Sequence, residues 1–257
     1  MVNRKDILRR IRRAWVVFGG SAMLVFVVWS AWAYRATADA KAALVSDAQV
    51  EVVRADHHWR FAPVGAAPTK VGLLFFPGAM VDPAAYAPLA RSIARAGYPV
   101  VLIELPRRGV LGGADGAEAL GRAAMRRWSD ISAWVVAGHS RGAVVAATLV
   151  HQGGPGLAGL VLMGTTHPRD FSLAETRIPV TKIQATKDGI APVAASEENR
   201  RLLPASVRWV AIDGGNHSQF GYYGFQPGDR FAAVTREKQQ EVTAREILSM
   251  LEAAAPR

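Results

Sequence analysis

The 257-residue chain contains no cysteine, so disulfides and thiolate chemistry are both excluded. Histidine is scarce too, with six in all, and four of them lack the spacing of metal ligands: His57, His58, His151 and His167. The sequence also lacks the glycine patterns of phosphate-binding and dinucleotide-binding turns. It therefore predicts neither a metal nor a cofactor.

Charge is missing from one long stretch, residues 14–34, which read AWVVFGGSAMLVFVVWSAWAY. About 20 apolar residues form a helix long enough to cross the hydrocarbon core of a bilayer. Aromatic side chains typical of the membrane interface lie near both ends of this run: Trp15, Trp29, Trp32 and Tyr34. Residues 1–13 hold six basic side chains against Asp6 alone, and such a flank stays in the cytoplasm.

Three interpretations of the apolar run are open: an uncleaved anchor, a cleaved signal peptide and a buried core helix. The small residues ATADA at 36–40 could serve as a cleavage site, but signal-peptide apolar regions span only about 7 to 15 residues. The basic residues directly before the run argue against a core helix. We therefore expect a single-pass anchor in a bacterial cytoplasmic membrane, with the N-terminus inside and the remainder outside.

The net charge of +10 does not indicate nucleic-acid binding. About half of the excess lies in residues 1–13, and the rest is spread over more than 200 residues without a basic and aromatic stripe. No nucleic-acid partner is expected.

Beyond a polar, alanine-rich stretch at 35–48, which we interpret as a tether, short apolar runs alternate with helix-like segments. Strands are expected at 50–55, 58–63, 71–76, 99–105, 132–138, 157–164, 179–186 and 207–213. Continuous apolar strands separated by helices predict an α/β fold, with a mostly parallel, twisted sheet covered on both faces. We find no internal repeat, so residues 49–257 are predicted to form one domain.

The segment Gly138-His139-Ser140-Arg141-Gly142 fits the pattern G-x-S-x-G between a predicted strand and a predicted helix. A nucleophilic serine on a tight strand-to-helix turn needs small neighbours two residues away on each side. A serine that only caps a helix needs neither glycine. The context therefore favours Ser140 as a nucleophile. Its neighbour His139 cannot be the base, because adjacent side chains diverge on such a turn.

A serine nucleophile needs a base, and the base needs an acid to orient it. Asp188 directly follows the predicted strand 179–186, and His217 lies in a glycine-rich loop after the last predicted strand. Both positions are carboxyl ends of strands, where ligands bind in open α/β sheets. Asp170, after the preceding strand, is the alternative acid. The turn at Asp188-Gly189 and a simple loop histidine are the competing structural interpretations.

Two backbone N–H groups are predicted to form an oxyanion hole, those of Arg141 and Ala79. Arg141 begins the helix after the nucleophile. Ala79 follows Gly78 in the loop after the strand 71–76, where Gly78 permits close approach.

The stretches FFPGAMVDPAAYAPLARSIARAGYPVVLIELP, AGHSRGA, TKDGIAPV and GGNHSQFGYYGFQPGD resemble the α/β-hydrolase superfamily over roughly residues 50–253. They are most similar to its compact, nearly lidless bacterial members, akin to dienelactone hydrolases and small carboxylesterases. The resemblance implies a Ser140-His217-Asp188 triad that transfers an acyl group in two steps. Dienelactone hydrolases use a cysteine nucleophile, which this chain lacks.

The expected function is that of a membrane-anchored serine hydrolase acting on carboxylic esters. A lysophospholipase or other lipid esterase, and an amidase or peptidase, would use the same triad. An inactive hydrolase fold that serves as a binding module is the alternative from another class. The segment 165–178, where a lid would be inserted, is only about 14 residues long, which favours an open site.

Overall fold

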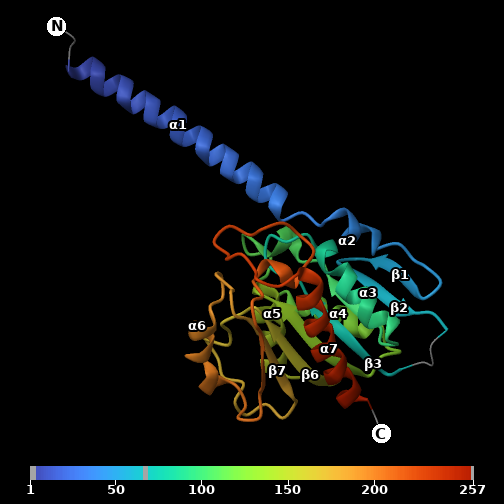
Figure 1. The fold of residues 1–257 in the computed structure, drawn as a ribbon. Helices are drawn as coiled ribbons and strands as arrows, with labels where there is room; N and C mark the ends of the chain where they lie inside the picture. The colour runs from blue at the N-terminus through green and yellow to red at the C-terminus, as the bar shows by residue number, and fades with distance from the viewer. Residues whose placement is uncertain (1–3, 66–68, 256–257) are drawn as a thin grey trace.

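An eight-stranded sheet lies at the centre of the computed structural model, which describes residues 4–65 and 69–255 (Figure 1). Its strand order is β1-β2-β4-β3-β5-β6-β7-β8. The hairpin β1–β2 joins β4 in antiparallel fashion, and every other neighbouring pair is parallel. The strands are β1 (Val50–Ala55), β2 (His58–Pro63), β3 (Val71–Phe76), β4 (Val100–Ile103), β5 (Ala133–His139), β6 (Leu157–Met163), β7 (Val180–Ala185) and β8 (Arg208–Ile212).

Helices cover both faces of the sheet. The described residues form α1 (Arg4–Ala33), which lies outside these layers, and α2 (Ala38–Ala42), α3 (Ala87–Arg95), α4 (Glu118–Arg127), α5 (Arg141–His151), α6 (Val193–Glu197) and α7 (Arg236–Ala254), with 3₁₀ turns at Pro83–Tyr86, Pro106–Gly109, Arg200–Leu202 and Ser218–Phe220. Side chains alternate across β3: Leu73 and Phe75 belong to the core beneath α3 and α7, whereas Leu74 and Phe76 belong to the core beneath α5. Two apolar cores therefore hold the layers together.

The predicted α/β fold with a mostly parallel sheet and helices on both faces is confirmed. Every expected strand is present, with bounds that differ by a few residues. β4 is shorter than the expected 99–105, because the chain leaves the sheet before Leu105 and turns at Pro106–Gly109. This early exit leaves room for a loop beside the carboxyl end of β3.

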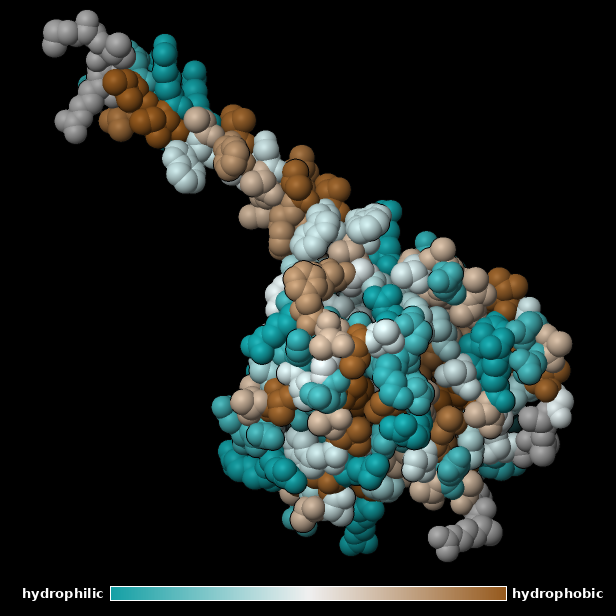
Figure 2. Space-filling model, viewed as in Figure 1, coloured by the Kyte–Doolittle hydropathy of each residue, from teal (hydrophilic) through white to brown (hydrophobic). Residues whose placement is uncertain are grey.

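The N-terminal helix α1 projects away from the domain (Figure 1). Its segment Lys5–Ser30 is long and apolar enough to cross a membrane. Figure 2 shows hydrophobic colour along the middle of this helix and hydrophilic colour gathered at its far end. An apolar helix without protein neighbours is consistent with either an anchor or a signal sequence.

The segment 35–48, interpreted as a tether, is instead folded onto the domain. Ala36 and, on α2, Ala40 are buried, and the N–H of Thr37 donates to the carbonyl of Tyr222 at 2.9 Å. The Arg91 side chain binds the other end of the segment through the carbonyls of Ala43 and Val45 and through Asp47. Alanine-rich composition suggested solvent exposure, but small side chains also permit close packing, and that is their role here.

Lys182 on β7 is fully buried, and burial lowers its pKa to about 7. Its ammonium donates to the carbonyl of His167. Between pH 7 and about 10.5 the unfolded chain binds the extra proton, so stability rises with pH across that window. We expect Lys182→Met to raise the free energy of unfolding at pH 7. This gain over the wild type should become smaller towards pH 10. Urea unfolding of both proteins at pH 7, 8.5 and 10 measures this, and a gain that does not change with pH would contradict it.

Candidate active site

Ser140 stands at a sharp turn between β5 and α5, with φ +53° and ψ −118°. This backbone conformation is costly for a residue with a side chain, so its neighbours must impose it. A Cβ on Gly138 would lie 2.3 Å from the carbonyl oxygen of Gly142, and a Cβ on Gly142 would lie 2.1 Å from the carbonyl oxygen of Phe76. Both glycines of the motif are therefore required by close backbone contacts.

The two predicted oxyanion donors lie on either side of this contact. Arg141 is the first residue of α5, which packs against the end of β3, and Ala79 follows that strand by three residues. Within residues 4–65 and 69–255, no hydrogen bond uses the N–H of Ala79 or of Arg141. The N–H of Gly78, by contrast, donates to the Tyr86 hydroxyl at 3.1 Å. Of these two loop residues, Ala79 is the one whose donor is free for an oxyanion.

Tyr86 links that loop to the residue before Ser140. Its hydroxyl lies 2.8 Å from Nδ1 of His139 and already accepts from Gly78, so its single proton points to His139. Burial raises the pKa of Tyr86 and lowers that of His139 well below the usual value, with the neighbouring His217 lowering the latter further. Both groups are therefore neutral. This link was not foreseen from the sequence, where Tyr86 is one aromatic residue in a helix-like segment.

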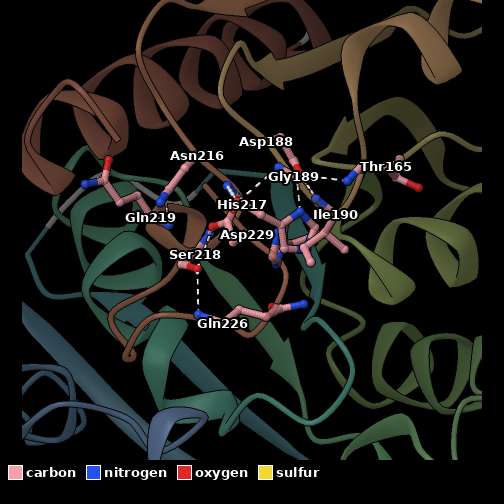
Figure 3. A network of polar contacts seen from close by, with 12 residues as sticks. Thr165, Asp188, Gly189, Ile190, Asn216, His217, Ser218, Gln219, Gln226 and Asp229 are labelled. Carbon is pink, nitrogen blue, oxygen red and sulfur yellow. Dashed lines mark hydrogen bonds and ion pairs between the residues drawn. The ribbon is translucent and has the colours of Figure 1, made fainter. Parts of the chain in front are cut away.

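Asp188 and His217 meet as the sequence predicted. Oδ2 of Asp188 lies 2.8 Å from Nδ1 of His217, and both side chains are buried (Figure 3). Oδ1 of Asp188 accepts from the N–H groups of Ile190 at 2.8 Å and Ala191 at 2.6 Å, which fixes the carboxylate. The alternative acid, Asp170, is exposed in the loop after β6, and the structure does not bring it to His217.

The His217 ring packs against the residue that precedes Ser140, and among the described residues no hydrogen bond joins His217 to the Ser140 hydroxyl. Its ring centroid lies 4.4 Å from that of His139, the residue before Ser140. Nε2 of His217 is buried and has no hydrogen-bond partner among the described residues. A buried nitrogen without a partner is costly, and a role in proton transfer explains why it is kept. A neutral imidazole held by a carboxylate at Nδ1 can accept a proton at Nε2.

Asp229 joins the acid loop to the base loop, and nothing in the sequence marked it beyond a Gly-Asp turn. Its Oδ1 accepts from the N–H groups of Gly189 at 3.1 Å and His217 at 3.3 Å. Its Oδ2 accepts from the N–H and the hydroxyl of Ser218 at 2.8 and 2.6 Å (Figure 3). One carboxylate thus holds the residues next to Asp188 and His217 in fixed positions.

We expect Asp229→Asn to lower kcat by about 10²-fold while KM changes little, because an amide cannot accept all these hydrogen bonds and the imidazole shifts. Steady-state kinetics on p-nitrophenyl acetate measure the effect. Asp213→Asn is the matched control, since Asp213 starts the same loop but, among the described residues, its side chain accepts only from the Thr186 hydroxyl, at 3.1 Å. Equal activity in both variants, with equal melting temperatures, would show that Asp229 does not position the base.

Among the described residues, no group of three or more histidine, cysteine or acidic side chains could hold a metal ion.

Solved structures similar to this chain share its fold. The Thermus thermophilus protein TT1662 superposes with a TM-score of 0.59 at 19% identity, covering 81% of this chain and all of its own. A protein described as an alpha-beta serine hydrolase homologue from Coxiella burnetii gives 0.53 at 18% identity, covering 79% of this chain and 99% of its own. A structure from a study of the metagenome-derived lipolytic enzymes LipS and LipT gives 0.57 at 14% identity, with coverages of 81% and 99%. No curated protein sequence matches the chain.

A family model supplies the remaining evidence. The model described as "Alpha/beta hydrolase family" matches residues 72–241, about two thirds of the chain and every residue of the site from Ala79 to Asp229. The sheet order, the serine turn and this match agree, and the chain is a hydrolase that belongs to the alpha/beta hydrolase family.

Proposed function

We propose that the protein is a serine hydrolase of carboxylic esters. The observation that carries this proposal is the buried Asp188–His217 pair, whose imidazole packs against the residue before the strained turn of Ser140 and whose Nε2 has no hydrogen-bond partner among the described residues. The parts of an acyl-transfer site are a nucleophile, a base, an orienting acid and oxyanion donors, and one candidate for each lies at this edge of the sheet.

The reaction proceeds in two steps. Oγ of Ser140 attacks the ester carbonyl and its proton passes to Nε2 of His217, while Asp188 holds the Nδ1 proton and stabilises the imidazolium. The carbonyl oxygen becomes an oxyanion that accepts from the N–H groups of Ala79 and Arg141. The C–O bond to the alcohol then breaks, and His217 returns the proton to the leaving alkoxide. Water attacks the acyl-enzyme by the reverse route and releases the acid.

An open site favours small or partly exposed esters. The connection between β6 and β7, residues 164–179, contains neither helix nor strand. This connection therefore contains no lid that could enclose the acyl chain of a substrate. The amidase and peptidase alternatives remain outcomes of the same assay.

Hydrolysis of p-nitrophenyl acetate, together with labelling by a fluorophosphonate probe, tests the proposal. We expect turnover and labelling that map to Ser140. A folded protein that is neither labelled nor active would favour the inactive binding module. Turnover of peptide or amide substrates in preference to esters would replace the ester assignment.

We further propose that α1 anchors the enzyme in a bacterial cytoplasmic membrane, with the basic N-terminus inside and the catalytic domain outside. The packing of α2 supports an anchor over a cleaved signal. Cleavage within residues 36–40 would remove Tyr34 and Ala36 from the buried surface, leaving a cavity in the domain. Protease treatment of intact spheroplasts tests the orientation, because a cytoplasmic domain would resist digestion until lysis.

Two truncations separate the anchor from the folded domain. A chain beginning at Ala33 retains Tyr34 and α2, and we expect a soluble enzyme with unchanged turnover of p-nitrophenyl acetate. A chain beginning at Lys41 loses the buried side chains of Tyr34, Ala36 and Ala40, and we expect it to be less stable by about 3 kcal/mol or more. Thermal unfolding of both measures this. Equal stability would restore the tether interpretation, and aggregation of the longer chain would place the apolar helix in the core.

A further inference from the structure

The end of α1 is attached directly to the loops that carry the catalytic groups. The carbonyl of Ala33 accepts from the N–H of Gly224 at 2.7 Å, and the ring of Tyr34 stacks on that of Tyr223, with centroids 6.2 Å apart. Both partners lie in the loop that follows His217. The carbonyl of Tyr34 accepts from the N–H of Asp82 at 2.9 Å, in the loop that follows Ala79.

Because of these contacts, no flexible linker separates the apolar helix α1 from the domain. Trp29 and Trp32 are exposed on α1, and Ala33 is the next residue. Exposed tryptophans of this kind lie at the membrane interface, so the first contacts with the domain are within one helical turn of the bilayer surface. Figure 1 shows α1 leaving from the end of the domain at which α7 begins, opposite the C-terminus. That end holds the carboxyl ends of the parallel strands.

Exposed apolar side chains gather at the same end. We call Met80, Leu111, Ile190 and Phe231 the apolar rim. They lie in the loops after β3, β4, β7 and β8, so they come from four separate parts of the sequence. Leu111 is 83% exposed and Phe231 79%, and Phe231 also stacks on Phe225 with centroids 4.8 Å apart. Apolar side chains exposed from four loops at one end of a domain form a surface that an apolar partner could cover.

Arginines stand beside the rim residues. Arg107 and Arg108 precede Leu111, and the carbonyl of Arg108 accepts from the N–H of Met80 at 2.7 Å. Arg230 precedes Phe231, and all three arginines are exposed. Apolar groups interleaved with arginine are typical of surfaces that lie on a bilayer, with the cations at the level of the headgroups.

We propose that the apolar rim rests on the outer surface of the bilayer that holds α1, and that the substrate is an ester of a lipid in that same bilayer. This inference rests on the proposed function of the Ser140 site. The short 164–179 connection fits it, because the bilayer itself takes the place of a protein lid over the acyl chain. The lipid enters from the membrane side, and its carbonyl meets Ser140 at the rim.

The absence of cysteine makes a direct test possible. Leu111→Cys, Phe231→Cys and the control Val64→Cys are each labelled with an environment-sensitive nitrobenzoxadiazole probe in the full chain, reconstituted in phosphatidylcholine–phosphatidylglycerol vesicles. Val64 is also exposed, at 50%, but follows β2, away from the catalytic edge. We expect nitroxide lipids to quench the probes at 111 and 231 several-fold more strongly than the probe at 64. Equal quenching at all three sites would overturn the proposed orientation.

A second measurement tests the substrate class. Full-length enzyme and a fluorogenic diacyl phospholipid are placed in the same vesicles or in separate vesicles, with p-nitrophenyl acetate as a soluble reference. We expect lipid hydrolysis at least tenfold faster in shared vesicles. The double variant Leu111→Ser with Phe231→Ser should lower the ratio of lipid to p-nitrophenyl acetate turnover at least tenfold, and Val53→Ser with Val64→Ser should not.

The outcomes distinguish this inference from the proposed function. Turnover of p-nitrophenyl acetate with no lipid hydrolysis, or with equal rates in shared and separate vesicles, overturns the lipid substrate and leaves the esterase assignment in place. Loss of both activities in a folded protein that a fluorophosphonate does not label overturns the esterase assignment, and the lipid inference with it.

Discussion

Replacing Ser140 with alanine is expected to lower kcat for p-nitrophenyl acetate by about 10³-fold or more and to abolish fluorophosphonate labelling. In the proposed mechanism the serine supplies the atom that forms the acyl-enzyme, so no neighbouring group can take over its part of the reaction. The proposed oxyanion donors, the N–H groups of Ala79 and Arg141, should stay in place, because alanine adopts the same strained backbone at no greater cost. Residual turnover should therefore exceed that of water alone.

Ser172→Ala is the matched control for this experiment. Ser172 is an exposed loop serine whose hydroxyl accepts from the N–H of Ala174 at 3.1 Å. It should keep full turnover and full labelling. Wild-type turnover in the Ser140 variant would move the nucleophile elsewhere and end the triad assignment. Lost turnover in both variants would indicate a general folding defect, which thermal unfolding would reveal.

The strands were predictable because most lie inside a sheet covered on both faces. β3 (VGLLFF) and β4 (VVLI) are buried at every position, and an unbroken apolar run marks both strands in the sequence. The helix ends were less predictable. α4 begins at Glu118 rather than near residue 115, because the preceding chain, from Val110 to Ala117, is held in turns by its own backbone hydrogen bonds.

The residues of the candidate site also differ in how far the sequence could predict them. Ser140, Asp188 and His217 could be placed from the sequence because each follows a recognisable strand, and parallel strands end at one edge. Asp229 could not, since its role depends on five donors supplied by two loops that only the folded chain brings together. The role of Tyr86 could not be predicted for a similar reason, because its hydrogen-bond partner His139 is 53 positions away in the sequence.

The segment 35–48 shows where composition misleads. Alanine and polar residues are common in linkers and equally common where a chain passes closely over a folded surface. What distinguishes the two cases is Arg91 on α3, whose guanidinium binds Asp47 at 2.6 Å and two carbonyls of the segment. The residues in this contact are more than 40 positions apart, so no local sequence pattern indicates it.

Replacing Gly142 with alanine is expected to be strongly damaging for a change of one methyl group, lowering stability by about 3 kcal/mol or more. The new Cβ would lie 2.1 Å from the carbonyl oxygen of Phe76 and 2.4 Å from that of Pro77. Both obstacles are backbone atoms of the strand end that leads to Ala79, so relief requires α5 to move away from the oxyanion loop. Thermal unfolding and p-nitrophenyl acetate turnover should both fall.

Gly97→Ala separates this clash from the ordinary cost of losing a glycine. Gly97 has φ +98°, and a Cβ added there would meet no atom of the described residues within 4 Å beyond its chain neighbours, so alanine brings strain without a clash. Its expected cost is about 1 kcal/mol with full activity. If Gly142→Ala proved no worse than Gly97→Ala, α5 would not pack against β3 as closely as described. In that case the two glycines around Ser140 would be incidental, and the sequence pattern would lose the physical reason that singles it out.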